Sequence, residues 1–563
     1  MFPHSAEFRS SLAFGALLAA VFTASAVHAQ TVAPQPHVFD SSLIDKSIDP
    51  CDNFYRYSCN GWFKHNPLPA DQTSYGRFTE LYEVNRLHLR QILEQAAAPA
   101  AATGRNANEQ KIGDEYSSCM DTAAINKLGL APLQPELDRI AALKTTAQLP
   151  ALLAHLHSIG VNAFFALGSN QDFADSNSVI GFYGAGGLGL PERDYYTRSD
   201  AKSREQRQQY LAHVRKIFTL ADEPEAKAAK DAETVLAIET RLAKASLTVT
   251  EQRDPQNLNH PTNVAAFSQD LTHFSLPDYV AAAHAPAVGK VNDMEPKFFA
   301  EFNTLIADTP LVHIKTYLRW QLLNAYAGTS LPESFDKENW NFYSHILNGA
   351  QVQQARWKRC TSRVDSELGE ALGQVYVAKY FPPADKQRAL DMTLAIEQAM
   401  DKDIDALDWM SPETKVKAKD KLHTVMNKIG YPDKWRDYSK LEIVPGDALG
   451  NQMRATEFEI ARELAKIGKP VDKGEWGMTP PTVDAYYNPQ QNNVNFPAGI
   501  LQAPFFSGAE DDAANYGDMG STIGHELTHG FDDEGRQFDR DGNLKNWWTR
   551  NDEEKFNARA DCE

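Results

Sequence analysis

Apolar residues recur at three- and four-residue spacing through most of the chain between Glu109 and Met426. The stretches SREQRQQYLAHVRKIFTLA and LGEALGQVYVAKYF show this spacing, which is typical of helices that bury one face. The segments GAGGLGLPERDYY and EQRDPQNLNHPTN interrupt it, because Gly, Pro, Asn and Asp favour turns. The pattern therefore predicts a long, largely helical region with loops.

The pattern changes near Pro480. The segments TVDAYY and NVNFPAGIL are short, β-prone and aromatic, and the turn residues NPQQN separate them, which predicts a hairpin or two paired extended segments. The next segment, DDAANYGDMGSTIGHELTHGFDD, is predicted to form a helix. Another helix is predicted to begin after Thr549, a suitable N-cap with Asp552 three positions on. This helical pattern is still running at Glu563, so we expect the chain to be incomplete at its C-terminus. The predicted fold class is mainly α with a small β portion.

The first 29 residues differ from the rest of the chain. Arg9 precedes the apolar run SLAFGALLAAVFTASAV, and the small residues Val27 and Ala29 occupy the positions that signal peptidases require. The run is short for a membrane-spanning helix, which needs about 20 residues. We predict a cleaved signal peptide at 1–29 and export to the periplasm or the medium. An uncleaved membrane anchor is the alternative.

Composition and charge narrow the possible partners. The chain has 563 residues, of which 42% are hydrophobic, and a net charge of -19. It is long enough for two or three domains, and its acidic balance argues against nucleic acid and anionic membrane surfaces as partners. The five cysteines are an odd number for an exported protein, so one thiol is free or its partner lies elsewhere.

The segment IGHELTHGFDDEG carries the chemistry. His525 and His529 are four residues apart, so on a helix both side chains face the same side and can bind one metal ion. The carboxylate of Glu526 can reach a water molecule bound to that metal. This is the arrangement of zinc hydrolases, in which zinc lowers the pKa of its water to about 7 and the glutamate takes the water's proton. A surface helix with two solvated histidines is the alternative.

The residues around this motif bear on the rest of the metal site. Asp532 and Asp533 are close enough in sequence for one of them to accept the free N–H of a zinc-bound imidazole. The longer motif with a third histidine is excluded, because Asp532 and Gly535 occupy its defining positions. Glu553 and Glu554 are the internal candidates for a third ligand. The segment FDDEGRQFDRDGN lacks the regular acids of a calcium loop, so a polar turn is favoured there.

A larger set of motifs now points to a family. They are PCDNFYRYSCNGW, GLGLPERDYY, RDPQN, WKRC, LGEALGQVYV, VDAYYNP, FPAGILQAPFF, NYGDMGSTIGHELTHGFDDEG and DGNLKNWW. From Asp49 onward the chain resembles the neprilysin and endothelin-converting-enzyme family of zinc metallopeptidases, in particular its exported bacterial members. The resemblance implies a thermolysin-like (gluzincin) catalytic domain at 480–563, incomplete at its C-terminus. A large helical N-terminal region at 49–435 would cap it.

The resemblance also implies roles for single residues. His525 and His529 would hold one Zn²⁺ per chain, and Glu526 would be the general base of an endopeptidase for small peptides. The segment with Asp484 and Ala485 would pair with the substrate backbone like an added strand.

Two features of the substrate site follow from the same resemblance. Asp484 stands where the family has Asn, and a carboxylate accepts hydrogen bonds but does not donate them. Phe78, Ile500 and Phe505 resemble the lining of an apolar pocket that favours cleavage before hydrophobic residues, and ordinary core positions are the alternative for all three.

The cysteines and the third ligand complete the comparison. The resemblance implies a disulfide between Cys119 and Cys360, while the counterparts of Cys51, Cys59 and Cys562 pair with cysteines near the C-terminus. A bridge between Cys51 and Cys59 is an alternative.

The family's third zinc ligand is a glutamate in a Gly-Glu-Asn-x-x-Asp motif, which this chain lacks. We therefore expect weak or no activity from this chain alone. The rival hypothesis is a truncated, non-catalytic relative that binds peptides or acts as a scaffold.

Overall fold

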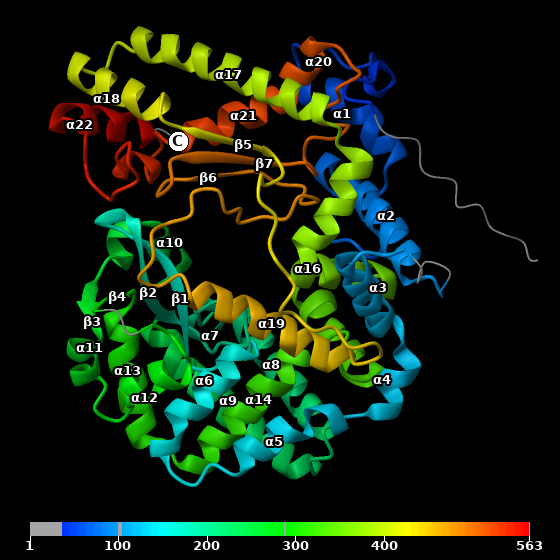
Figure 1. Cartoon of the computed structure of the whole chain (residues 1–563), viewed down its shortest axis with the longest axis vertical. Coiled ribbons are helices and arrows are strands. Elements are labelled where there is room, and N and C mark those ends of the chain that lie inside the picture. Colours follow the sequence, from blue (N-terminus) through cyan, green and yellow to red (C-terminus); the bar gives the residue numbers. More distant parts are fainter. Residues whose placement is uncertain (1–36, 100–103, 287–288, 562–563) are drawn as a thin grey trace, which may run out of the picture. The chain divides into compact units, whose positions relative to one another are not determined.

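The computed structural model describes residues 37–99, 104–286 and 289–561. The predicted signal peptide, residues 1–29, and Cys562 lie outside these ranges. Within them the chain folds mainly into helices, with two small sheets (Figure 1). None of the described helices is both long enough and apolar enough to cross a membrane.

The helices come in two groups along the chain. The two ends contribute α1 (Phe54–His65), α2 (Arg77–Ala97), α3 (Ala107–Met120), α16 (Arg356–Tyr380), α17 (Pro383–Ala406), α18 (Pro412–Leu422), α19 (Ala448–Leu464), α20 (Asp512–Gly517), α21 (Met519–Thr528) and α22 (Arg550–Ala560). The middle contributes α4 (Thr122–Leu128), α5 (Gln134–Ala141), α6 (Leu149–Ser158), α7 (Asp194–Thr197), α8 (Ala201–Leu220), α9 (Glu225–Ala245), α10 (Val249–Arg253), α11 (Val264–Asp270), α12 (Leu276–Ala282), α13 (Pro296–Asp308), α14 (Leu311–Tyr326) and α15 (Glu333–Asn339).

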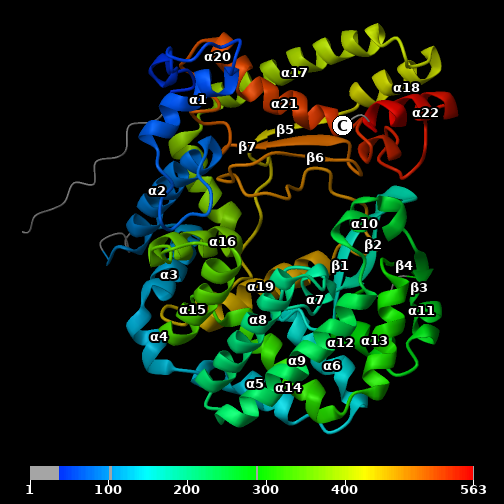
Figure 2. The same cartoon turned by 180° about the vertical axis from the view of Figure 1, so that it is seen from behind.

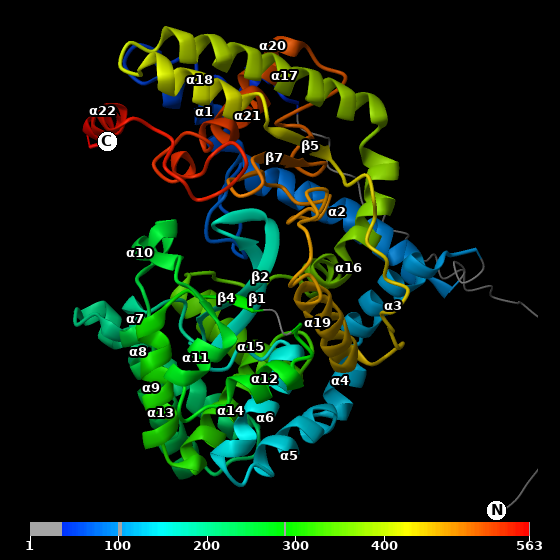
Figure 3. The same cartoon turned by 60° about the vertical axis from the view of Figure 1, so that its left-hand side comes forward.

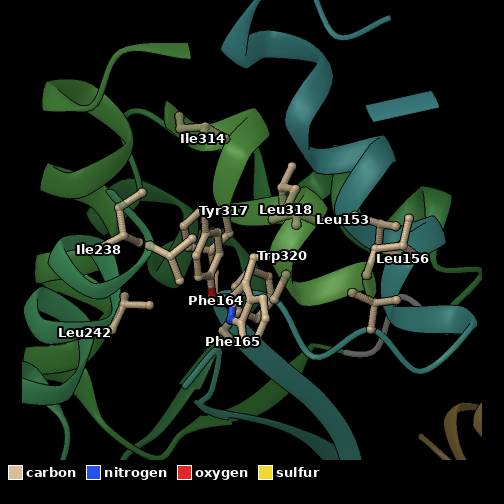
Figure 4. Close-up of a cluster of buried hydrophobic side chains, with 14 of the residues drawn as sticks. Leu153, Leu156, Phe164, Phe165, Ile238, Leu242, Ile314, Tyr317, Leu318 and Trp320 are labelled. Carbon is tan, nitrogen blue, oxygen red and sulfur yellow. Dashed lines mark hydrogen bonds between the residues drawn. The ribbon is translucent and has the colours of Figure 1, made fainter. Parts of the chain in front are cut away.

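The middle of the chain encloses the first hydrophobic core, which we define as the buried cluster between Leu133 and Phe342 together with Leu449. Helix α8 buries Tyr210, Val214 and Ile217 at the three- and four-residue spacing seen in the sequence. Helix α14 is buried on most of its sides and packs against α8 and α9. Tyr317 of α14 packs on Phe164, with the ring centroids 4.5 Å apart (Figure 4), and Trp320 of the same helix packs edge-on against Tyr210. The predicted helical packing is confirmed in this part of the chain.

A four-stranded sheet lies within the region that periodicity assigned largely to helices. Its strands are β1 (Phe165–Asp172), β2 (Asp175–Ala185), β3 (Pro261–Asn263) and β4 (Lys290–Asp293), in the order β1-β2-β4-β3. β1 and β2 form a long antiparallel hairpin, and α19 packs beside β1 (Figure 3). The helical prediction is therefore wrong here. The strands are rich in Gly, Ser and Asn, which hides the two-residue alternation, and β4 reaches β2 from more than a hundred residues away.

A second sheet of three strands carries the segments that the sequence predicted to pair. β6 (Tyr486–Asn488) and β7 (Asn493–Pro497) are antiparallel, with Tyr486 opposite Asn495, so the predicted hairpin is confirmed. A third strand, β5 (Met426–Gly430), runs parallel to β7 on its other side. The sequence did not predict β5, because its short MNKIG segment pairs with residues more than sixty positions away. All five residues of β7 are buried, and β6 is left at the edge.

The two ends of the chain share the second hydrophobic core, which we define as the buried cluster from Leu81 to Cys119 and from Cys360 to Trp548. It joins α2, α3 and α16 to the sheet and to α21. A disulfide between Cys119 and Cys360 links α3 to α16, as expected. α17 packs against α18, α21 and β5 (Figure 1 and Figure 2). The early helices are therefore part of the support of the later segment that carries the two histidines.

Near the C-terminus, the structure corrects one predicted helix and confirms one predicted N-cap. The single helix predicted from Asp511 to Asp533 is two helices, α20 and α21, with a break at Asp518, where ψ is -78°. The buried side chain of Asn515 in α20 exchanges hydrogen bonds with the backbone of Ser507, which ties α20 to the loop before it. The N-cap of α22 is confirmed, because Thr549 accepts the backbone N–H of Asp552.

Candidate metal centre and active site

Helix α21 presents two histidines on one face. Met519, Ile523 and Leu527 are buried in the second core and fix the rotation of the helix. His525 and His529 lie on the remaining side, and their Nε2 atoms are 3.0 Å apart. The four-residue spacing predicted this convergence, and packing of the apolar side holds it in place.

A carboxylate orients the second histidine. Nδ1 of His529 lies 2.7 Å from Oδ2 of Asp532. The other carboxylate oxygen accepts the backbone N–H groups of Gly535 at 2.7 Å and Glu534 at 3.1 Å. A proton on Nδ1 leaves the lone pair of Nε2 free, which is the tautomer that a metal ligand needs. Asp533, the other candidate for this role, is exposed and makes no side-chain hydrogen bond within the described residues.

The two imidazoles and Glu526 form a donor set that fits zinc. The possible ligand atoms of His525, Glu526 and His529 lie within 4.8 Å of one another, and the described residues form no other such group. Two nitrogen ligands of a tetrahedral zinc ion, each about 2.0–2.1 Å from it, are separated by about 3.3 Å. The observed separation of 3.0 Å needs little adjustment to reach that value. Neutral imidazoles with one oriented by a carboxylate are the ligands that zinc prefers.

Glu526 lies on α21, which contacts β6, the edge strand of the second sheet. The side chain is buried, and this burial raises the pKa of Glu526 above its ordinary value. The two neighbouring histidines and the backbone N–H of Tyr487 on β6 oppose that rise, while the charge of Asp484 adds to it. Burial therefore makes this carboxylate a stronger base than an exposed glutamate, which suits a general base.

The segment predicted to bind the substrate backbone is exposed at Asp484, just before β6 begins. Asp484 is exposed and accepts the backbone N–H of Ala485, and both residues precede the first paired residue of β6. Since β7 is the only partner of β6 within the described residues, the other edge of β6 can accept an extended peptide. The edge and the buried Glu526 belong to the same part of the site, because the backbone N–H of Tyr487 on β6 lies close enough to lower the pKa of Glu526.

Residues 50–432 match the family model described as Peptidase family M13 for its N-terminal part, and residues 484–563 match a second model with the same description. The chain belongs to peptidase family M13. The members of this family are zinc metallopeptidases, so zinc is the expected metal. The boundaries 49–435 and 480–563 stay a prediction.

Curated relatives of this M13 peptidase cover most of the chain. Endothelin-converting enzyme 1 of Rattus norvegicus is 30% identical over 543 residues, which are 92% of this chain and 70% of the relative. Neprilysin-3 of Drosophila melanogaster is 30% identical over 547 residues, which are 92% of this chain and 69% of the relative.

Solved structures agree with the fold of this M13 peptidase. The zinc metalloprotease ZMP1 of Mycobacterium tuberculosis, in complex with an inhibitor, is 35% identical with a TM-score of 0.88, over 94% of this chain and 80% of that one. PepO from Lactobacillus rhamnosis is 23% identical with a TM-score of 0.83, over 91% of this chain and 80% of that one, and shows the fold alone. The neighbours combine a helical N-terminal domain with a thermolysin-like catalytic domain, which confirms the predicted fold class.

The three predicted pocket residues of this M13 peptidase differ in exposure. The rings of Phe78 and Phe505 meet with their centroids 4.5 Å apart, and Phe78 is 50% exposed. Ile500 is completely buried in the second core, which agrees with the alternative of an ordinary core position for this residue. Phe78 is therefore the member of the three with free apolar surface for a ligand.

The internal candidates for a third zinc ligand lie elsewhere. Glu553 is 3.2 Å from Nη1 of Arg536, and Glu554 is 3.0 Å from Nε of Arg550. Neither belongs to the group formed by the two histidines and Glu526. Both glutamates are therefore wrong as ligand candidates in this structure.

The remaining cysteine alternative is also decided. Cys51 and Cys59 are both free, so the alternative bridge between them is not formed.

Sequence reasoning missed two groups that shape the site. The backbone N–H of Tyr487 reaches Glu526, and no side-chain pattern can show this. Lys421 on α18 is buried behind the turn that follows the histidine helix. The segment KVKAKDK gives four similar lysines at alternate positions, so nothing in the sequence distinguishes Lys421.

A large cavity lies apart from these residues. Its volume is about 1130 Å³, and its lining comes mainly from β5, α17, α19 and the segments around them, including Lys428, Tyr431 and Trp435. His525, Glu526 and His529 are not among its lining residues. The donor chemistry of α21, and not the size of a cavity, therefore marks the candidate active site.

Proposed function

We propose that this M13 peptidase is a zinc endopeptidase that hydrolyses small peptides before hydrophobic residues. The observation that carries the proposal is the convergence of the two histidine Nε2 atoms beside the buried Glu526, next to a free strand edge. His525 and His529 would hold the metal. Zinc, when bound there, supplies a Lewis acid that lowers the pKa of a water and polarises the scissile carbonyl.

Glu526 is proposed as the general base. Its raised pKa lets the carboxylate take a proton from the attacking water and pass it on to the leaving amine. Asp532 would keep the His529 imidazole in the tautomer that leaves Nε2 free. The burial that raises the pKa of Glu526 also limits the access of bulk water to its carboxylate.

The free edge of the second sheet would bind the substrate backbone. A peptide that extends along β6 can exchange main-chain hydrogen bonds with the segment of Asp484 and Ala485. The carboxylate of Asp484 can accept a substrate N–H and cannot donate to a substrate carbonyl. Phe78, packed on Phe505, offers the apolar surface on which a hydrophobic residue after the cleaved bond could rest.

Export to the periplasm or the medium is part of the proposal. The disulfide between Cys119 and Cys360 supports it, because such bonds persist in oxidising compartments and are rare in the cytosol. We also propose that the 563-residue chain by itself has weak activity. With Glu526 acting as the general base, the described residues place no further His, Cys, Asp or Glu ligand in the group with the two histidines.

The test compares Glu526→Gln with Glu554→Gln, an exposed glutamate of α22. We expect the purified chain to contain zinc by mass spectrometry and to cleave a quenched fluorescent peptide slowly. Glu526→Gln should keep the zinc and lose cleavage by about 10²- to 10⁴-fold, while Glu554→Gln should leave both unchanged. Cleavage that survives Glu526→Gln, or a chain without zinc, would contradict the proposal. Peptide binding without any cleavage would favour the non-catalytic relative.

A further inference from the structure

We propose that Lys421 is a positioning residue for the metal centre, which acts on His529 through the turn Gly535–Phe538 and the carboxylate of Asp532. This inference rests on the proposed zinc site. Lys421 lies at the C-terminal end of α18, 98 residues before Met519, the first residue of the histidine helix.

The side chain of Lys421 is hydrogen-bonded to the turn and forms no salt bridge within the described residues, although the charges of Asp532 and Asp539 also attract its amine. Its Nζ donates to the carbonyl oxygens of Gly535 at 2.7 Å and Phe538 at 2.8 Å. The residue is 1% exposed, and no carboxylate among the described residues lies within 4.0 Å of Nζ. Burying an ammonium without a carboxylate partner is costly. The two carbonyl groups of the turn are therefore the partners that hold this side chain in place.

Three aromatic rings close the space around the amine. The ring centroids of Tyr487, Phe531 and Trp547 lie 5.8 to 5.9 Å from Nζ of Lys421. They exclude water from the two hydrogen bonds, which strengthens both of them. Phe538 is held from a second side, because its carbonyl also accepts the indole N–H of Trp547 at 2.9 Å.

Hydrogen bonds of the peptide groups in the turn connect the Lys421 side chain to the metal centre. The carbonyl of Gly535 accepts from Lys421, and the N–H of the same residue donates to Asp532. Asp532 in turn lies against Nδ1 of His529. A side chain at Gly535 would place Cβ 1.7 Å from the carbonyl oxygen of His529, so the turn packs directly on the end of the histidine helix. Movement of Gly535 must therefore move the group that orients His529.

The backbone of Lys421 makes a separate connection that a side-chain substitution leaves intact. Its carbonyl accepts from Nδ2 of Asn492, and Oδ1 of Asn492 accepts the hydroxyl of Tyr487. Replacing only the side chain therefore tests the route to Asp532 and preserves the contact with β6.

The experiment uses the full chain with Lys421→Met, which keeps an apolar side chain in the aromatic surroundings and removes the donors. Lys419→Met is the matched control, because Lys419 lies two residues earlier and pairs with Asp401 and Asp405. We expect Lys421→Met to weaken zinc binding by about tenfold in competition with a chelator, the lower end of the range for groups that orient a ligand. The kcat should fall with the zinc-binding strength while KM stays constant, and Lys419→Met should change none of these values.

A double-mutant cycle separates positioning from general stability. In the Asp532→Ala background, Lys421→Met should cause no further loss of zinc affinity, because the route through Asp532 is already cut. A loss that is the same in both backgrounds would overturn the inference. Equal zinc affinity of the wild type and Lys421→Met would also overturn it, and would leave the proposed peptidase function untouched.

Two further measurements keep the inference testable if zinc binding or folding fails. In the metal-free chain labelled with ¹⁵N-histidine, His529 should change from the Nδ1–H tautomer to a mixture in Lys421→Met, with His529→Gln used to assign the signal. An unchanged tautomer would contradict the inference even if the wild type bound no zinc.

Should Lys421→Met not fold, Trp547→Phe removes the other donor to Phe538 and keeps an aromatic ring. Its loss of zinc affinity should be smaller and should also vanish in the Asp532→Ala background.

Discussion

At the scale of single residues, spacing along the sequence determined most of the candidate metal centre. Two histidines four positions apart must share a helix face, so their convergence needed only the prediction of a helix. The choice between Asp532 and Asp533 could not be made in this way, because both follow the motif closely. The turn after α21 decides it by directing Asp532 toward His529 and Asp533 into solvent.

This difference gives a prediction with an internal control. Asp532→Ala should weaken zinc binding by about 10- to 100-fold, because Nδ1 of His529 loses the acceptor that fixes its tautomer and orientation. Asp533→Ala, one residue away and exposed, should bind zinc as the wild type does. Chelator competition on the two purified variants measures both values. Equal zinc affinity of Asp532→Ala and Asp533→Ala would contradict the assignment.

At the scale of elements, the structure joins α22 to α18 through one buried carboxylate. Asp552 accepts hydrogen bonds from the backbone N–H and hydroxyl of Ser411 and from the hydroxyls of Thr414 and Thr549. Burial alone would raise the pKa of Asp552, but these hydrogen bonds lower it to about 2. The sequence suggested Asp552 only as a helix-capping neighbour of Thr549, since Ser411 is 141 residues away.

The lowered pKa predicts how stability depends on pH. A group whose pKa is lower in the folded chain stabilises it above the unfolded pKa, near 4, and this contribution disappears as the pH falls toward 2. The shift corresponds to about 2 kcal/mol at neutral pH. Between pH 6 and pH 3 the wild type should therefore lose about 1 kcal/mol more of its free energy of unfolding than Asp552→Asn does. Chemical denaturation at both pH values measures the difference, with Glu554→Gln as a control on the same helix. An equal loss in the wild type and Asp552→Asn would show that the carboxylate is not held as described.

At the scale of the whole molecule, the chain builds two hydrophobic cores with different roles. The first core uses the middle of the chain, and the second joins residues of both ends around α21 and the second sheet. The N-terminal helices α2 and α3 therefore share a core with the histidine helix. A reading along the sequence could not show this, because helical periodicity identifies the buried side of a helix and not the element that covers it.

The two cores predict separate effects on stability and metal binding. Phe302→Ala in the first core should destabilise the fold by about 3 to 5 kcal/mol and leave zinc affinity unchanged. Ile523→Ala, on the buried face of α21, should destabilise the fold by about 2 to 5 kcal/mol and also weaken zinc binding, because the cavity lets the histidine helix shift. Thermal unfolding combined with chelator competition distinguishes the two variants. A loss of zinc affinity in Phe302→Ala would mean that the first core also supports the metal centre.

The sequence by itself determined the features that depend on neighbours along the chain. These are the helices with clear periodicity, the hairpin of β6 and β7, the convergence of His525 and His529, and the N-cap at Thr549. Only the tertiary structure decided the features that depend on distant partners. β5 beside β7, the sheet of β1 to β4, the contact of Asp532 with its turn, and the burial of Lys421 belong to this second group. The physical reason is that spacing fixes which face of an element a residue occupies, whereas packing between distant segments fixes what that face meets.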